Sequence, residues 1–131
     1  MSRRQLTTFT AALAIAIGFA APALAALGDM NVATFLAKAD ALKSQGAMAM
    51  FSSDIEVLKS EGKAAAESYK ARLLRERAAG HPSSCPPQGT GIDTDALLGH
   101  LRSYPANLRP RVSMKQAMAD YFIRKYPCGK R

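Results

Sequence analysis

The stretch Cys85–Cys128, CPPQGTGIDTDALLGHLRSYPANLRPRVSMKQAMADYFIRKYPC, begins and ends with the only two cysteines of the chain. It holds two segments with apolar residues at helical spacing, separated by the turn Ala106–Arg111. Two helices of similar length joined by a short linker pack antiparallel, so the start of one lies near the end of the other. We therefore predict a helical hairpin whose open end is closed by a disulfide between Cys85 and Cys128.

Capping and stop signals bound both helices of this hairpin. Asp93 or Thr94 can cap the first helix, and Pro105 ends it. Ser113 followed by Gln116 forms a capping box for the second helix. The apolar stripes that should face the core are Leu97, Leu98, Leu101 and Tyr104 in the first helix, and Met114, Ala117, Met118, Tyr121 and Phe122 in the second. Pro127 prevents continuation past Tyr126.

Two further helices are predicted upstream. The first begins after Asn31 and stops at Gly46, and the second begins at a capping box formed by Ser53 and Glu56 and continues to about Ala79. No strand-like alternation occurs anywhere. The predicted fold class is all-α, a small domain of four to five helices with the disulfide-closed hairpin at its C-terminal end.

The apolar run between these two helices, Ala47–Phe51, has two interpretations. Methionine adapts its shape readily, so Met48, Met50 and Phe51 could form a flexible binding surface. The plainer interpretation, which we favour, is a short helical connector that plugs the core.

The first 25 residues have the pattern of a secretory leader. Arg3 and Arg4 precede an apolar run, and small residues at Ala23 and Ala25 predict cleavage after Ala25. The apolar run is shorter than the roughly 20 residues needed to span a bilayer, so an uncleaved anchor is the weaker alternative. We expect a periplasmic or secreted protein with one helical domain over residues 26–131.

Export supports the disulfide, because an oxidising compartment makes pairing the default for two cysteines. A metal site or a redox pair is the alternative, but the sequence has no CxxC motif and no Cys/His cluster at zinc spacing. The pair closes a separation of 43 residues. The chain-entropy treatment gives such a bond about 4 kcal/mol.

Residues suited to catalysis or to cofactor binding are scarce. His81 stands beside a proline in a loop and His100 on a helix without a nearby acid, so both are expected to be solvated surface residues. Asp93 and Asp95 occupy a helix N-terminus, where acids are favoured anyway. Gly89-Thr90-Gly91 lacks the lysine of a phosphate-binding loop. We expect neither an enzyme nor a bound cofactor or metal.

The chain is basic, with a formal net charge of +8. Removal of Arg3 and Arg4 with the leader lowers it by two, to +6. Many cations fall in or beside the hairpin, and Arg109 with Arg111 would give its turn a positive tip. Export and the absence of aromatic residues among these cations argue against nucleic acid. An acidic protein partner or an anionic envelope surface fits better, although a merely solvated basic face is the most economical interpretation.

The residues at both ends of the hairpin resemble a known family. The opening Cys85-Pro86-Pro87-x-Gly89, the helix ending Tyr104-Pro105 and the closing Tyr126-Pro127-Cys128 resemble the Rap/Tai family of small exported immunity proteins. The resemblance implies a helical, disulfide-bonded periplasmic protein that binds a peptidoglycan-amidase effector of type VI secretion and blocks its active site. Upstream, Ala66–Tyr69 keeps only the tyrosine of the family's Cys-x-Gly-Tyr-like element.

The leading hypothesis is accordingly an exported helical binding protein, with an amidase effector as the partner that the resemblance implies. The candidate partner-binding residues lie in the two predicted exposed loops: Gln88, Thr90, Asn107, Arg109 and Arg111. The first of these loops could instead serve only to deliver Cys85 to Cys128. A periplasmic stress chaperone and a structural envelope protein that binds an anionic polymer remain the alternatives.

Overall fold

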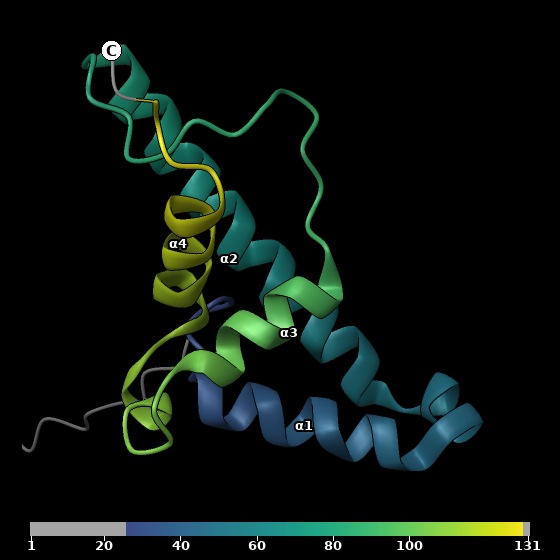
Figure 1. Cartoon of the computed structure of the whole chain (residues 1–131). Helices are drawn as coiled ribbons and strands as arrows, with labels where there is room; N and C mark the ends of the chain where they lie inside the picture. The colour runs from purple at the N-terminus through teal and green to yellow at the C-terminus, as the bar shows by residue number, and fades with distance from the viewer. Residues whose placement is uncertain (1–25, 130–131) are drawn as a thin grey trace, which may run out of the picture.

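The computed structural model describes residues 26–129 and consists of helices joined by short connections (Figure 1). The helices are α1 Val32–Gln45, α2 Ser53–Ala78, α3 Thr94–Ser103 and α4 Met114–Lys125, with two 3-10 helices, η1 Gly46–Phe51 and η2 Arg109–Arg111. No strand occurs within the described range. The all-α class is confirmed. The predicted leader, residues 1–25, and its cleavage site after Ala25 lie outside the described residues.

Side-chain caps begin the helices largely where the sequence predicts them. Asn31 accepts a hydrogen bond from the Thr34 amide at 2.8 Å, and Asp93 accepts one from the Ala96 amide at 2.9 Å. The cap of α2 is displaced by one residue, because Ser52 rather than Ser53 has extended backbone and accepts from the Asp54 amide. Each cap satisfies an amide that the helix itself leaves without a partner.

The long helix α2 is the largest element of the domain. It has 26 residues, so it is about 39 Å long. Figure 1 shows α4 lying along the C-terminal half of α2, α3 crossing in front of it, and α1 meeting its N-terminal end at the η1 elbow. Among all helix pairs, α2 and α4 make the most extensive contact. The predicted disulfide between Cys85 and Cys128 is present, but α4 packs mainly on α2 and only slightly on α3, the helix predicted to be its antiparallel partner.

One apolar cluster joins all four helices. The predicted stripes of α3 and α4 face inward, and α1 and α2 add Phe35, Leu36, Ala65, Tyr69 and Leu73. Tyr69 stacks on Phe122 with ring centroids 5.3 Å apart. Because every helix contributes to this cluster, none of them is expected to be stable alone.

The segment before α1 is hydrogen-bonded to the start of α4 and to α2. The Lys115 amide donates to the Gly28 carbonyl and the Met114 amide donates to the Met30 carbonyl. Glu61 of α2 is only 7% exposed and accepts from the Gly28 amide at 2.7 Å and the Met30 amide at 3.3 Å. Gly28 has a φ of 90°, and a Cβ there would lie 3.2 Å from the Ala65 nitrogen, so this position requires glycine.

The run Ala47–Phe51 does not plug the core, which corrects the favoured interpretation. It forms the connector η1, but Met48, Met50 and Phe51 are 66%, 80% and 83% exposed. Gly46, with a φ of 58°, ends α1 and turns the chain outward, so the elbow lies beyond the apolar cluster. Hydrophobicity alone could not distinguish a plug from an exposed tip.

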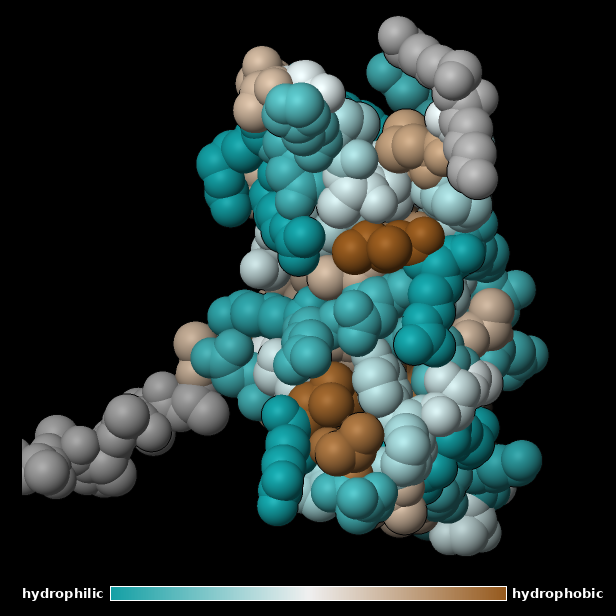
Figure 2. Space-filling model, turned by 60° about the vertical axis from the view of Figure 1, so that its left-hand side comes forward, coloured by the Kyte–Doolittle hydropathy of each residue, from teal (hydrophilic) through white to brown (hydrophobic). Residues whose placement is uncertain are grey.

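Within residues 26–129 no helix combines the length and the apolar character needed to cross a membrane. Figure 2 shows one face of the molecule, where hydrophilic side chains predominate and hydrophobic ones form small separate patches.

Candidate partner-binding surface

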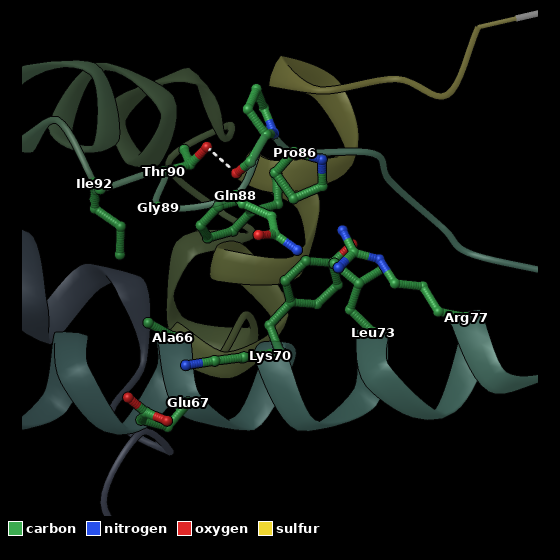
Figure 3. Close-up of a pocket in the computed structure, with 14 residues that line it drawn as sticks. Ala66, Glu67, Lys70, Leu73, Arg77, Pro86, Gln88, Gly89, Thr90 and Ile92 are labelled. Carbon is green, nitrogen blue, oxygen red and sulfur yellow. Dashed lines mark hydrogen bonds between the residues drawn. The ribbon is translucent and has the colours of Figure 1, made fainter.

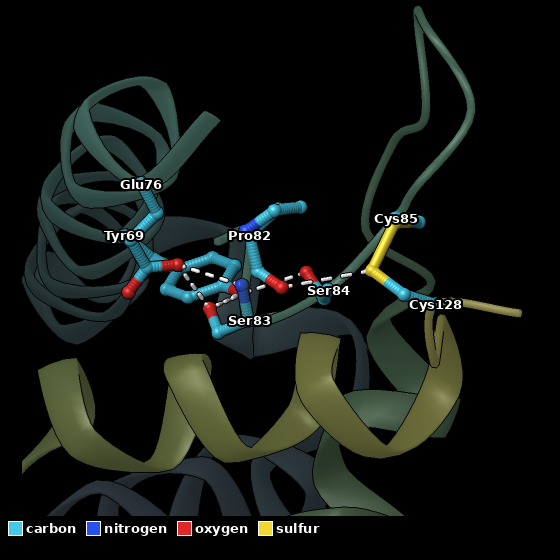
Figure 4. The surroundings of a disulfide bond; sticks show 7 residues. All are labelled: Tyr69, Glu76, Pro82, Ser83, Ser84, Cys85 and Cys128. Atoms are coloured by element: carbon cyan, nitrogen blue, oxygen red, sulfur yellow. Dashed lines mark hydrogen bonds between the residues drawn. A yellow bond between two sulfur atoms is a disulfide. The ribbon is translucent and has the colours of Figure 1, made fainter. Parts of the chain in front are cut away.

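The predicted disulfide is present and fixes the start of the loop Cys85–Ile92 (Figure 4). The Cα atoms of Cys85 and Cys128 are 4.9 Å apart. Beside the bond, the Cys85 amide donates to the Tyr126 carbonyl at 2.8 Å. The loop is therefore held to the C-terminal end of α4 by one covalent bond and one backbone hydrogen bond.

A polar cluster attaches the residues before Cys85 to α2. The Tyr69 hydroxyl lies 2.6 Å from the hydroxyl of fully buried Ser84 and 2.9 Å from that of Ser83. The Ser83 amide and hydroxyl both donate to the Glu76 carboxylate. In Figure 4 these side chains lie between α2 and the disulfide. The chain is thus anchored to α2 immediately before it is anchored to α4.

The arrangement of Glu76 and Ser83 resembles a base beside a hydroxyl, but its electrostatics do not suit general-base catalysis. Hydrogen bonds from Ser83, followed by the hydrogen bond from Arg72, lower the pKa of Glu76 to about 2. A base so weak at neutral pH contributes little to proton abstraction. We interpret the cluster as a structural anchor.

Beyond Cys85 the loop separates from α2 and leaves a cleft of about 590 Å³ (Figure 3). The cleft is lined by Ala66, Glu67, Tyr69, Lys70, Leu73 and Arg77 of α2, by Pro86–Ile92 of the loop and by Phe122 of α4. Its volume lies within the range of small-ligand and peptide-side-chain pockets. Of the predicted site residues, Gln88 and Thr90 are in its wall.

Charged side chains border this cleft. Lys70, Arg77 and Glu67 are all exposed, and none of them forms an ion pair with another described residue. Figure 3 shows Arg77 reaching from α2 toward the loop, whereas Lys70 lies along the helix in the direction of Glu67. Arg72 and Glu76, four residues apart on α2, form an ion pair at 2.6 Å.

The second predicted loop lies elsewhere. Asn107, Arg109 and Arg111 are in the turn between α3 and α4, at the opposite end of α3 from the cleft, and η2 packs against α1. Arg109 donates to the Tyr104 carbonyl at 2.9 Å and to the Arg102 carbonyl at 2.7 Å, so its guanidinium caps the end of α3. The five candidate residues therefore belong to two separate surfaces.

His100 is not the solvated residue that the sequence predicted. It is partly buried between the rings of Tyr104 and Tyr121, with centroid distances of 5.3 and 5.8 Å. Its Nε2 donates to the Ala117 carbonyl at 3.1 Å, which fixes this proton on Nε2. Burial lowers the pKa of His100, because the imidazolium is poorly solvated there. His81, in contrast, is exposed as expected.

Metal-ligand groups do not gather in the described part of the chain, where no three His, Cys, Asp or Glu side chains could hold an ion together. Asp93 serves as the cap of α3, and neither histidine has a cysteine or carboxylate ligand set around it.

Lys70 and Arg77 were missed as cleft residues by sequence reasoning, as were the anchors Tyr69 and Glu76. Lys70 and Arg77 are seven residues apart, so the sequence is enough to place them on one face of a helix. That this face lies opposite the Cys85–Ile92 loop was not readable, because it depends on where the disulfide puts the loop.

Comparison of the chain with protein-family models, with curated proteins and with solved structures found no match.

Proposed function

We propose that this chain is an exported helical binding protein whose Cys85–Ile92 loop and adjoining cleft engage another protein. The observation that carries the proposal is the double anchoring of this loop. Ser83 and Ser84 bind it to α2, and the disulfide binds it to α4, before it leaves the body of the domain. A loop fixed in this way loses little conformational freedom on binding, so more of the contact energy appears as affinity.

The sequence resemblance supplies the class of partner, a peptidoglycan-amidase effector. In this role the chain would cover the active-site cleft of the amidase and protect the cell wall of the producing cell. The amidase proposal rests on the Cys-Pro-Pro opening and the Tyr-Pro-Cys ending of the hairpin. The anchored loop gives such an inhibitor a rigid element to present.

The test is co-expression with a panel of envelope-directed amidase effectors, followed by affinity purification and a lysis assay. We expect one effector to co-purify with the chain and cells to survive its export. Gln88→Ala with Thr90→Ala should weaken the complex at least tenfold, whereas Asn107→Ala with Arg111→Ala tests the separate turn surface. Absence of any bound amidase and of any protection would reject this function.

A second candidate function, a chaperone for unfolded envelope proteins, is favoured by the exposed elbow. Met48, Met50 and Phe51 are large apolar side chains, 66%, 80% and 83% exposed, and they do not belong to the core cluster. Adaptable methionine surfaces suit binding of varied clients. Suppression of aggregation of heat-unfolded malate dehydrogenase, lost in the triple Met48→Ser, Met50→Ser, Phe51→Ser variant, would favour this function. Equal aggregation with and without the protein would exclude it.

A further inference from the structure

The floor of the Cys85–Ile92 cleft is apolar and its aromatic rings are largely buried. Leu73 and Phe122 lie beneath it and partly buried Ile92 closes one side. Tyr69 and Phe122 stack on each other with an interplanar angle of 20° and are only 4% and 9% exposed, so their rings offer little face to a nucleobase. An aliphatic side chain is the group that such a floor accepts.

The rim of the cleft carries two cations at a defined separation. Lys70 and Arg77 are seven residues apart on α2, about two turns and therefore about 10 Å along the axis. An extended polyproline-II segment advances about 3.1 Å per residue and returns to the same side every third residue. Two carboxylates three positions apart on such a segment are thus about 9 Å apart, which matches the spacing of the two cations.

One carboxylate of the protein lies among these groups. Glu67 lines the same cleft, and Figure 3 shows it near the Lys70 end rather than the Arg77 end. A bound carboxylate is therefore held more strongly by Arg77, which can also form two parallel hydrogen bonds with it. Glu67 opposes binding of a second carboxylate at Lys70.

We propose that this cleft binds an extended acidic segment of the partner protein, with carboxylates at Arg77 and Lys70 and an aliphatic side chain between them on the apolar floor. The inference rests on the proposed binding function and specifies the partner's chemistry at that site. The overall positive charge of the chain favours the approach of acidic segments, and the exposed Lys70 and Arg77 supply cations at this cleft.

The test uses a fluorescein-labelled peptide, acetylated and amidated, with two glutamates three positions apart flanking a leucine and with proline or alanine elsewhere. Titration with the disulfide-bonded protein should give saturable anisotropy. Replacing both glutamates by glutamine should weaken binding at least tenfold, and replacing the leucine by alanine should weaken it severalfold. Binding should also weaken between 50 and 500 mM NaCl, because exposed ion pairs are screened.

Three protein variants distinguish binding in the cleft from nonspecific attraction by the net charge of the protein. Lys70→Gln with Arg77→Gln should raise the Kd at least tenfold, and Glu67→Gln should lower it. The matched control is Lys63→Gln with Arg75→Gln, which removes two exposed cations from the same helix outside the cleft and should change the Kd less than twofold. Equal loss in the control pair, equal binding of the glutamine peptide, or no binding of the labelled peptide at 1 mM protein overturns the proposal.

Affinity purification with amidase effectors, run on the same variants, keeps this inference separate from the proposed function. If an effector binds the wild type and the Lys70/Arg77 variant equally, the function stands and the cleft assignment fails. If no effector binds but the peptide binds with the expected variant effects, the cleft assignment stands and the amidase partner fails.

Discussion

At the scale of single residues, the polar side chains that touch the core distinguish this domain from a simple apolar bundle. Glu61 and His100 both lie on faces where the sequence pattern is otherwise apolar or neutral, and each binds backbone groups far away in the chain. Such groups are costly to bury unless hydrogen-bonded, and both are. They therefore define how distant segments are joined.

Replacement of Glu61 should detach the segment before α1. Glu61→Ala leaves the Gly28 and Met30 amides without their acceptor, and hydrogen bonds to charged groups contribute roughly 1.5–3 kcal/mol. We expect the free energy of unfolding to fall by about 2 kcal/mol, measured by urea denaturation. Glu67→Ala, an exposed carboxylate on the same helix, should change it by less than about 0.5 kcal/mol. Similar losses in both variants would contradict the anchoring role.

His100 should make the domain less stable as the solution becomes mildly acidic. The pKa of His100 is lowered in the folded protein, chiefly by burial, so the unfolded chain binds the proton more readily. Stability is then constant above the usual histidine pKa of about 6.5 and decreases as the pH falls below it. Tyr104, Tyr121, Asp120 and Arg124 are the other titratable groups around the ring.

This pH dependence can be isolated by comparing unfolding at pH 7.5 and pH 5.5. His100→Gln, which keeps a donor for the Ala117 carbonyl, should remove most of the loss, whereas His81→Gln should leave it unchanged. Glu76 does not interfere, because its pKa of about 2 confines its effect to lower pH, where stability is lost between about 4.5 and 2. An identical pH slope in wild type and His100→Gln would refute this assignment.

At the scale of the elements, capping and breaking residues made the helices predictable. Asn31, Asp93 and Ser113 each start a helix through a side-chain hydrogen bond, as expected from sequence. The partner of α4 was less predictable, because an apolar stripe shows which face is buried but not which helix covers it. The exposure of η1 and the position of the cleft could not be predicted for the same reason, because both depend on how the helices are placed relative to one another.

Gly62 is a weak point in α2 that can be improved. It lies in the helix interior, and a Cβ added there would meet no atom within 4 Å. Glycine costs about 0.5–1 kcal/mol relative to alanine in a helix, so Gly62→Ala should raise the free energy of unfolding by that amount. Gly28→Ala, at positive φ beside the Ala65 backbone, should lower it. Thermal denaturation of both variants checks this contrast.

At the scale of the whole molecule, the disulfide joins the two parts on which the proposed binding depends. It links the Cys85–Ile92 loop to the end of α4, and α4 is the main neighbour of α2. For a separation of 43 residues the chain-entropy treatment gives about 4 kcal/mol. Small domains have only about 5–15 kcal/mol of net stability, so this bond is a large share of the total.

Removal of the disulfide should therefore lower stability and binding together. For the Cys85→Ser, Cys128→Ser variant we expect a loss of about 4 kcal/mol, and a fall in Tm of about 15 °C or more. The wild type treated with reductant should behave in the same way, because neither state has the bond. Since the loop loses its covalent attachment and keeps only the Cys85–Tyr126 backbone hydrogen bond at the end of α4, the acidic peptide should also bind more weakly at temperatures where the variant is still folded. If the variant unfolds within about 1 kcal/mol of the oxidised protein and binds the peptide equally well, the Ser83, Ser84 and Tyr69 hydrogen bonds are sufficient to position the loop.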